Sequence, residues 1–239
     1  MLKNPCIIEL SEITDYDVSK IGNKANNLAT LKNKLGLNNI PESLLLLHNG
    51  FEDVEKTLTL NSSYIDSFLK FPIIVRSSTT VEDSSNSFAG LFYSGICATL
   101  DELHPNILKV FDSISTESVK SYCVRMKVKF SDIKCAVLLQ SYKKPNIAGV
   151  LFTRHPLTKD SSVIYIEYNE HSSDATTSGA AVPKFLIINK SDVEMISATW
   201  KNLCKIGLAI ESYWNYSVDI EWVISEGVLW ILQARSITA

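Results

Sequence analysis

The stretch that decides the fold is Val218–Arg235, which reads VDIEWVISEGVLWILQAR. Polar and apolar residues alternate along it, which is the pattern of two β-strands whose side chains point to opposite faces in turn. A three-residue loop, Ser225–Gly227, ends on the glycine that such loops favour and pairs Asp219 with Gln233. A two-residue loop would shift this pairing by one residue and split both faces. We therefore expect a hairpin with an odd-numbered loop.

One face of this hairpin is polar and the other is apolar. The polar side chains belong to Asp219, Glu221, Gln233 and Arg235. Carboxylate and amide oxygens suit Mg²⁺, and the guanidinium fork suits phosphoryl oxygens. Exposed alternation is also common in antiparallel sheets, so a solvent-facing strand pair is the alternative interpretation. The expected apolar face contains Val218, Ile220, Trp222, Ile224, Val228, Trp230, Leu232 and Ala234.

The rest of the chain indicates an α+β protein of two lobes, with helices and strands segregated, in which helices flank antiparallel sheets. Helical spacing occurs at 19–35, 101–113, 115–126 and 199–213, with a cap predicted at Ser115. Strand patterns occur at 44–47, 71–77, 91–98, 135–140, 149–153, 163–168 and 184–189. The polar stretch 49–70 is expected to hold one or two short helical turns. The loop 77–90 is long enough to suggest a functional role.

Composition excludes several classes of protein. The 239 residues carry a net charge of −3, without the clustered basic face that nucleic-acid binding requires. No apolar run approaches the roughly 18 residues of a membrane span, and the N-terminus lacks a signal-peptide core, so we expect a cytoplasmic protein. The five cysteines are widely spaced without a C-x-x-C motif, which indicates small buried residues rather than a zinc site.

Four sequence blocks together carry a resemblance to a known family. The chain resembles the N-terminal nucleotide-binding domain of pyruvate phosphate dikinase and phosphoenolpyruvate synthase, an ATP-grasp-like module that also occurs in rifampicin phosphotransferases and starch dikinases. The blocks follow one another in the family's order and are IGNKANNL (21–28), VRSSTTVEDS with SFAG (75–84 and 87–90), Gln140 with AGVLFTRHP (148–156), and DIEW with LQAR (219–222 and 232–235).

The resemblance implies a role for each matching residue, with ATP and Mg²⁺ as cofactors. Lys24, Arg76 and Arg235 would hold the triphosphate and act in catalysis. Glu221 and Gln233 would bind Mg²⁺, and Asp219 would support them. The loop formed by Ser87, Phe88, Ala89 and Gly90 would close over the phosphates, and Gln140, Ser141 and Tyr142 would lie on the adenine side. The alternatives are a solvated helix lysine for Lys24 and a structural ion pair for Arg76.

The resemblance also implies a division of labour. Residues 1–140 would form the lobe with the phosphate-binding loop, and residues 141–239 the lobe with the metal-binding hairpin. The sequence departs from the family pattern at Asn23, which replaces a glycine, and at Asn169–Ser173, which replaces a glycine-rich acidic loop. His155 is expected to be structural, and no histidine of the chain lies in the family's swivelling phosphohistidine motif.

Two functions follow from these observations. The first is an ATP-dependent phosphotransferase that passes a phosphoryl group to a histidine on a separately encoded partner protein or to a small molecule. The alternative is a non-catalytic nucleotide-binding regulatory protein, which the altered loop at Asn169–Ser173 favours. Retention of the charged residues argues for the first, because unpaired charges are costly to keep in a decayed site.

Overall fold

The computed structural model describes residues 6–14, 16–47, 54–82, 88, 90–170 and 183–237. Ser87, Ala89 and the loop residues 171–173 lie outside these ranges. The chain divides into two compact units. Unit 1 comprises Met1–Gly36 and Pro41–Tyr142, and unit 2 comprises Leu37–Ile40 and Lys143–Ala239.

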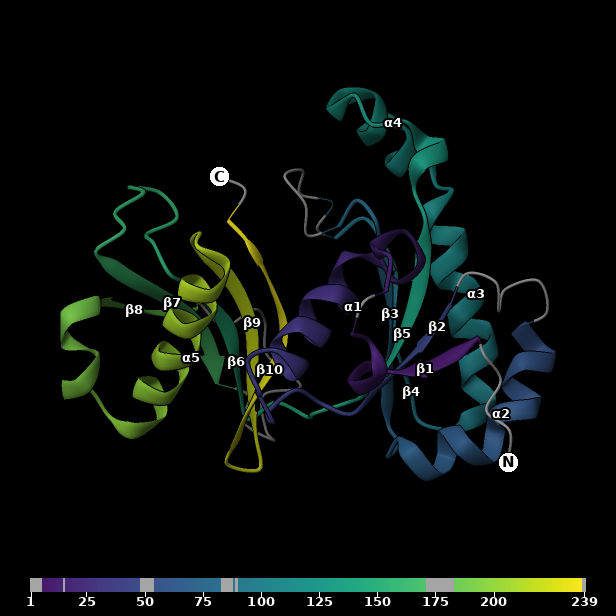
Figure 1. The fold of residues 1–239 in the computed structure, drawn as a ribbon, viewed down its shortest axis with the longest axis horizontal. Coiled ribbons are helices and arrows are strands. Elements are labelled where there is room, and N and C mark those ends of the chain that lie inside the picture. The colour runs from purple at the N-terminus through teal and green to yellow at the C-terminus, as the bar shows by residue number, and fades with distance from the viewer. Residues whose placement is uncertain are drawn as a thin grey trace. The chain divides into compact units, whose positions relative to one another are not determined.

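Within the described residues, unit 1 contains a five-stranded antiparallel sheet with the strand order β1-β2-β5-β3-β4. Figure 1 shows α1 on one side of this sheet and α2 and α3 on the other. The strands are β1 (Ile7–Glu9), β2 (Ser43–Leu46), β3 (Ile73–Thr79), β4 (Ser94–Cys97) and β5 (Cys135–Ser141). The helices are α1 (Val18–Asn33), α2 (Val54–Phe68), α3 (Leu103–Ile114) and α4 (Glu117–Met126), with short 3-10 turns at Leu10–Glu12, Leu100–Glu102 and Phe130–Asp132.

Apolar side chains cover both faces of the unit 1 sheet. Val75 of β3 and Leu139 of β5 belong to one buried cluster together with residues of α2 and α3. On the α1 side, Ile21, Ala25 and Leu28 are fully buried at helical spacing. Burial of a large apolar side chain contributes roughly 1.5–3 kcal/mol, so these contacts fix α1 and β3 against each other.

Helix α2 is longer than the sequence predicts, because the expected one or two turns form a helix of 15 residues. Val54, Leu58 and Ile65 are buried on one side of it. Asn61 and the neighbouring serines are weak helix formers, which made the stretch look like a loop. Packing of the apolar side into the core that includes α3 outweighs this weak propensity. The cap of α4 is also one residue later than predicted, at Thr116.

Unit 2 contains a second five-stranded antiparallel sheet in its described residues, with the order β10-β9-β6-β7-β8. Its elements are β6 (Ile147–Phe152), β7 (Val163–Glu170), β8 (Lys184–Asn189), a 3-10 segment at Lys190–Met195, α5 (Ala198–Trp214), β9 (Val218–Ser225) and β10 (Val228–Ser236). The prediction of an α+β protein with two antiparallel sheets and flanking helices is confirmed (Figure 1). No described helix is long and apolar enough to cross a membrane.

Helix α5 packs on one face of the unit 2 sheet (Figure 1). A side chain at Gly207 would place its Cβ 2.9 Å from Leu151 of β6, so the glycine permits this close approach. Trp200 of α5 meets the ring of Trp222 of β9 edge-on, at 5.8 Å between centroids. The short segment Leu37–Ile40 joins unit 2 through a hydrogen bond from the Ile231 amide to the Asn39 carbonyl.

The β9–β10 hairpin contradicts the predicted loop. Val228 pairs with Ser225, so the loop contains two residues rather than three. Glu226 and Gly227 both have left-handed φ angles, of 52° and 77°. Two successive left-handed residues are what a two-residue hairpin turn of type I′ requires. The sequence argued against this turn because, without a bulge, a two-residue loop would split both faces of the hairpin.

A shift of register at Leu232 restores the convergence of the polar residues. Beyond this β-bulge, Asp219 pairs with Arg235 and Glu221 pairs with Gln233. The predicted pairs of Asp219 with Gln233 and of Glu221 with Ile231 are therefore wrong. The grouping of the four polar residues on one face is nevertheless correct, because a bulge adds one residue to one strand and compensates for the shorter loop.

The two-residue loop separates the two tryptophans that were expected to be neighbours on the apolar face. Trp222 pairs with Ile231, and both are buried on the side that α5 covers. Trp230 pairs instead with Val223 and is half-buried. The ammonium of Lys143 lies 4.1 Å from the Trp230 ring centroid, a cation–π contact. The predicted continuous face of eight apolar residues is therefore not formed, because Trp222 and Trp230 lie on opposite faces of the hairpin.

Candidate functional site

Lys24 is positioned by a break near the start of α1. Gly22 has non-helical angles, φ 72° and ψ 164°, inside the helix. A Cβ at this position would lie 2.1 Å from the Ser78 carbonyl oxygen of β3, so only glycine allows the contact. The Ser78 hydroxyl spans the break, because it donates to the Ile21 carbonyl at 2.6 Å and accepts from the Ala25 amide at 3.0 Å.

The Lys24 ammonium donates to Glu82 Oε1 at 2.8 Å, and both side chains are buried, with exposures of 6% and 11%. The alternative interpretation of Lys24 as a solvated helix lysine is therefore wrong. The second carboxylate oxygen, Glu82 Oε2, accepts from the Ser77 hydroxyl at 2.9 Å and from the Thr79 amide and hydroxyl, each at 3.2 Å. The Glu82 amide donates back to the Thr79 hydroxyl at 3.0 Å.

Sequence reasoning assigned no role to Glu82, although a signal was present. Thr79 and Glu82 have the Thr-x-x-Glu spacing of a capping box, in which each side chain bonds the other residue's amide. Asn23 fixes the same turn, because its amide donates to the Thr80 and Glu82 carbonyls at 2.9 and 2.7 Å. The asparagine that departs from the family pattern thus has a structural role next to Lys24.

Arg76 lies on β3, where it pairs with Leu138 of β5 and Ser94 of β4. It is half-buried. Because strand residues alternate between faces, Arg76 belongs to the same face as Ser78, on which α1 packs. Both of the predicted unit 1 cations therefore come from the contact between α1 and β3.

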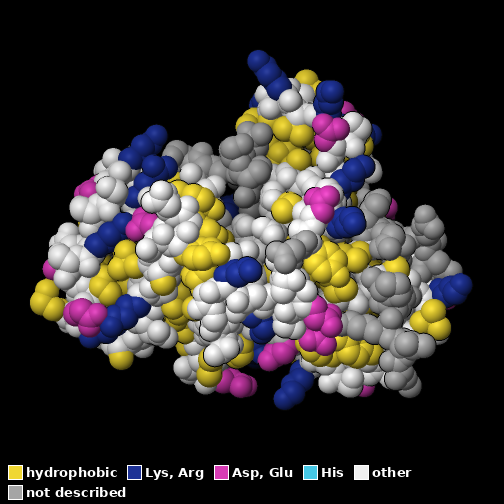
Figure 2. Space-filling model, viewed as in Figure 1, with side chains coloured by type: hydrophobic (Ala, Val, Ile, Leu, Met, Phe, Trp, Pro, Cys, Tyr) yellow, Lys and Arg dark blue, Asp and Glu magenta, His cyan; other side chains and the backbone are white. Residues whose placement is uncertain are grey.

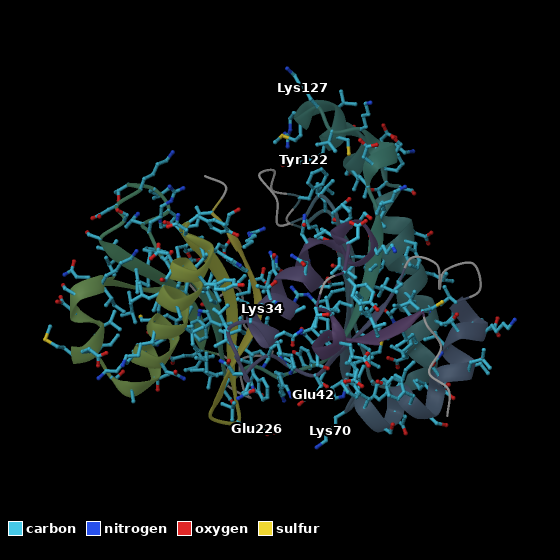
Figure 3. All side chains as sticks on the ribbon, viewed as in Figure 1. Lys34, Glu42, Lys70, Tyr122, Lys127 and Glu226 are labelled. Atoms are coloured by element: carbon cyan, nitrogen blue, oxygen red, sulfur yellow. The ribbon has the colours of Figure 1, made fainter. Side chains whose placement is uncertain are left out.

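Phe88 and Gly90 belong to the predicted phosphate loop. The Phe88 ring is buried in a small apolar cluster, edge-on to Tyr122 of α4 at 4.6 Å between centroids and stacked on Phe92 at 5.9 Å. Figure 3 labels Tyr122 on α4. Gly90 has φ 74° and nothing within 4 Å of the position of a Cβ. Phe88 is therefore anchored by its own side chain, which points into protein.

The predicted adenine-side residues lie at the end of β5. Gln140 is buried, and its amide donates to the Ser43 hydroxyl at 3.0 Å. The backbone amides of Ser141 and Tyr142 donate to the Glu42 and Pro72 carbonyls, respectively. The buried hydroxyl oxygen of Ser141 has no hydrogen-bond partner among the described residues. The adenine contact of these residues stays a prediction.

Asp219 and Arg235 form an ion pair across the β9–β10 hairpin of unit 2. Arg235 donates to Asp219 Oδ2 through Nε at 2.9 Å and through Nη2 at 2.8 Å. Burial raises the pKa of Asp219 above its ordinary value; the Arg235 guanidinium opposes this change, and the Glu221 carboxylate adds to it. Directly beside this pair, Glu221 is half-buried and its partner Gln233 is buried.

The Glu221–Gln233 pair offers oxygen donors that suit Mg²⁺. Among the described residues, no group of three or more His, Cys, Asp and Glu side chains could hold a metal ion. Mg²⁺ is commonly held by one or two carboxylates together with substrate phosphates rather than by a cage of protein ligands. One carboxylate and one amide in register on adjacent strands therefore fit a Mg²⁺ ion that also binds phosphate.

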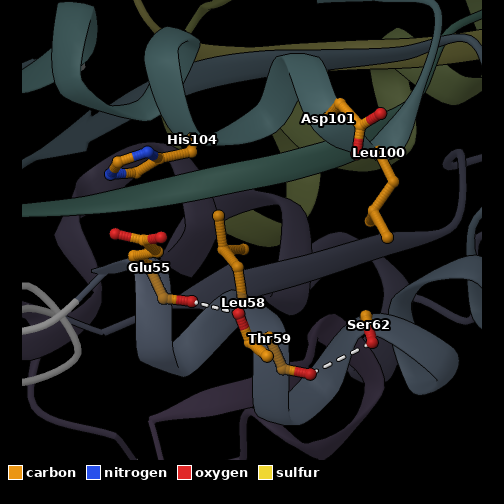
Figure 4. Close-up of a pocket in the computed structure, with 7 residues that line it drawn as sticks. All are labelled: Glu55, Leu58, Thr59, Ser62, Leu100, Asp101 and His104. Carbon is orange, nitrogen blue, oxygen red and sulfur yellow. Dashed lines mark hydrogen bonds between the residues drawn. The ribbon is translucent and has the colours of Figure 1, made fainter.

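A cavity of about 360 Å³ lies elsewhere in unit 1, between α2 and the start of α3 (Figure 4). It contains none of the predicted site residues. Its lining consists of Glu55, Leu58, Thr59, Ser62, Leu100, Asp101 and His104.

The chain is similar to one protein family and to several curated proteins. The family model of the pyruvate phosphate dikinase AMP/ATP-binding domain matches residues 13–202. A probable phosphoenolpyruvate synthase from Methanocaldococcus jannaschii is 26% identical over 204 residues, which cover 70% of this chain and 17% of that protein. The rifampicin phosphotransferase of Bacillus cereus is 26% identical over 200 residues, covering 69% of this chain and 23% of that protein.

Solved structures give a weaker likeness. A D-alanine–D-alanine ligase from Bacillus anthracis superimposes with a TM-score of 0.49 at 15% identity, covering 90% of this chain and 56% of the ligase. An L-amino acid ligase from Bacillus licheniformis also gives a TM-score of 0.49, at 13% identity, covering 90% of this chain and 43% of the ligase.

Proposed function

Because the chain belongs to the pyruvate phosphate dikinase AMP/ATP-binding domain family, we propose that it binds Mg-ATP and passes a phosphoryl group to an acceptor. The residues proposed to take part are Lys24, Arg76, Arg235, Asp219 and the Glu221–Gln233 pair. The chain spans only 17% and 23% of the length of these two relatives, so its phosphoryl acceptor is itself a proposal.

The observation that supports the proposal most directly is the arrangement of the β9–β10 hairpin. Two adjacent cross-strand pairs place a cation, two carboxylates and an amide on one sheet face. Such a set would be costly to bury without a function, because each ionised group loses hydration. The β-bulge at Leu232 is needed for this convergence, and bulges often occur where a side chain must be re-aimed beside a functional site.

The chemistry requires little more than position and charge. Phosphoryl transfer spreads negative charge over the phosphoryl oxygens, and cationic donors stabilise that charge. Arg76 and Arg235 supply guanidinium donors, and Lys24 supplies an ammonium. Asp219 holds the Arg235 guanidinium through two of its nitrogens, so the side chain is oriented before nucleotide binds. Glu221 and Gln233 would hold a Mg²⁺ ion, whose charge would offset part of the negative charge of the phosphates.

The acceptor is proposed to be a histidine on a partner protein or a small molecule. The small-molecule alternative is supported by the name of one relative, a rifampicin phosphotransferase. The described residues of this chain contain no feature that selects between a histidine and a small molecule.

The test is to incubate the chain with ATP labelled at the α-phosphate and to identify the nucleotide product. AMP would indicate dikinase-type chemistry, and ADP would indicate a simple kinase. Parallel incubations add rifampicin or a purified phosphohistidine domain of a relative as acceptor. Tight ATP binding without turnover under all these conditions would support the non-catalytic regulatory alternative, and absence of ATP binding would refute the proposal.

A further inference from the structure

We propose that Glu82 is a positioning residue that holds the Lys24 ammonium in place for the phosphoryl oxygens of the nucleotide. The inference rests on the proposed function and extends it to a residue outside the predicted site. Glu82 touches Lys24 directly, at 2.8 Å, and acts on the nucleotide only through it.

The carboxylate of Glu82 is fixed independently of Lys24. Three hydrogen bonds from Ser77 and Thr79 reach Oε2, while Oε1 accepts the Lys24 ammonium. Because Ser77 and Thr79 belong to β3, the strand that also carries Arg76, the orientation of Oε1 is tied to the sheet. Glu82 therefore fixes the Lys24 side chain, which belongs to α1, relative to β3.

The Lys24 ammonium keeps donors for a ligand. An ammonium has three N–H donors, and the bond to Glu82 takes one of them. No second partner for Lys24 is found among the described residues. A long lysine side chain loses rotamer entropy when a ligand orders it, and a carboxylate that orders it beforehand reduces this cost of binding.

An ion pair with only a structural role would stabilise the fold without ordering a side chain for a ligand. Three features point to a role beyond it. Glu82 is anchored on β3, the strand that carries Arg76; the turn that carries Glu82 is braced by Asn23, one residue from Lys24; and α1 breaks at Gly22, two residues before Lys24. This local departure from regular helix geometry is the kind of feature that marks functional sites.

The experiment measures dissociation constants of the full chain for Mg-ATP and for adenosine, which lacks phosphates. In Glu82→Gln, an amide nitrogen can face the ammonium in place of an acceptor, so we expect ATP affinity to fall about tenfold. Adenosine affinity should change less than about twofold, because no phosphate contact is lost. Tyr64→Phe is the control, since it removes a 2.6 Å hydrogen bond to Glu9 elsewhere in unit 1 and should change neither constant.

A double-mutant cycle separates positioning from general damage. Lys24→Met and Lys24→Met/Glu82→Gln should lose ATP affinity equally, because Glu82 acts only through Lys24. Additive losses, equal losses for ATP and adenosine, or an unchanged ATP affinity in folded Glu82→Gln would overturn the inference. If Glu82→Gln does not fold, Ser77→Ala keeps both charges and should weaken ATP alone, by about threefold; unchanged ATP binding there would also overturn it.

The two proposals fail in different ways. A wild-type chain that binds no ATP refutes the proposed function and this inference together. A wild-type chain that binds ATP, with Glu82 variants that bind it equally well, refutes this inference alone.

Discussion

Lys24–Glu82 in unit 1 and Arg235–Asp219 in unit 2 both pair a cation with a carboxylate, but different kinds of structure hold them. The first pair depends on a local turn, in which Thr79 and Glu82 bond each other three residues apart. The second depends on the register of two long strands. The first is therefore sensitive to the few residues around Gly22 and Glu82, and the second to the packing of a whole sheet.

The hydrogen bonds differ in the same way. Glu82 distributes its bonds over both oxygens and reaches a lysine through one contact. Asp219 receives both bonds of Arg235 at one oxygen. A guanidinium is planar and carries several fixed donors, whereas an ammonium is a compact charge on a flexible stem. The lysine therefore needs a carboxylate that is itself fixed, and the arginine needs a partner in register.

The largest expected effect comes from removing Arg76, the other predicted cation of unit 1. Arg76→Ala should lower the rate of phosphoryl transfer by about 10³ or more while the chain stays folded, because a phosphate-binding arginine stabilises charge in the transition state. The measurement is turnover of labelled ATP alongside thermal melting. Lys70→Ala, at an exposed lysine of unit 1 labelled in Figure 3, is the control. A large fall in melting temperature would support the structural ion-pair interpretation of Arg76.

The next prediction tests the packing of the sheet that carries the Arg235–Asp219 pair. Trp222→Ala should destabilise unit 2 by about 3–5 kcal/mol, because its ring is buried against Trp200. Trp230→Ala should cost about 1 kcal/mol, since this ring is half-buried and loses mainly the Lys143 contact. Denaturant unfolding of both variants measures the difference. Equal costs would contradict the register set by the two-residue loop and favour the two tryptophans on one face.

A third prediction concerns the local structure around the Lys24–Glu82 pair alone. Gly22→Ala should cost about 3 kcal/mol, because its Cβ would collide with the Ser78 carbonyl. The matched control is Gly36→Ala, which has a similar φ of 68° but open space around it and should cost about 1 kcal/mol. Denaturant unfolding again supplies the measurement.

Two buried cysteines can report where the damage of Gly22→Ala lies. Burial raises the pKa of Cys135 in unit 1 to about 12 and that of Cys204 in unit 2 to about 11, so both thiols should react slowly at pH 8. In Gly22→Ala, labelling of Cys135 should accelerate more than labelling of Cys204. Acceleration of Cys204 alone would contradict the assignment of Gly22 to unit 1 stability.

The smallest effect concerns the metal. ATP affinity should fall about tenfold when Mg²⁺ is removed with a chelator, because Glu221 and Gln233 are proposed to reach the phosphates through the ion. Calorimetry with and without Mg²⁺ measures this, and Glu221→Gln should reduce the dependence. Equal affinity under both conditions would count against the metal assignment while leaving the Lys24–Glu82 pair unaffected.

Local signals in the sequence were enough to predict several elements. Helical spacing predicted α1 and α5, and alternation placed Asp219, Glu221, Gln233 and Arg235 on one face. Side-chain direction repeats every two residues in a strand and every 3.6 in a helix, so neighbouring residues suffice for such predictions. Helix α2 was underestimated because the energy that stabilises it comes from packing with residues distant in sequence, not from its weak helix formers.

Contacts between residues that are distant in sequence depend on the tertiary structure. The sequence favoured a three-residue loop, but the register of β10 is set jointly by its pairing with β9, the bulge at Leu232 and the Ile231 contact to Asn39. Glu82 and Lys24 are 58 positions apart, and only the packing of α1 on β3 brings them together. A contact between distant residues depends on the sum of many small packing energies, which no short sequence pattern contains.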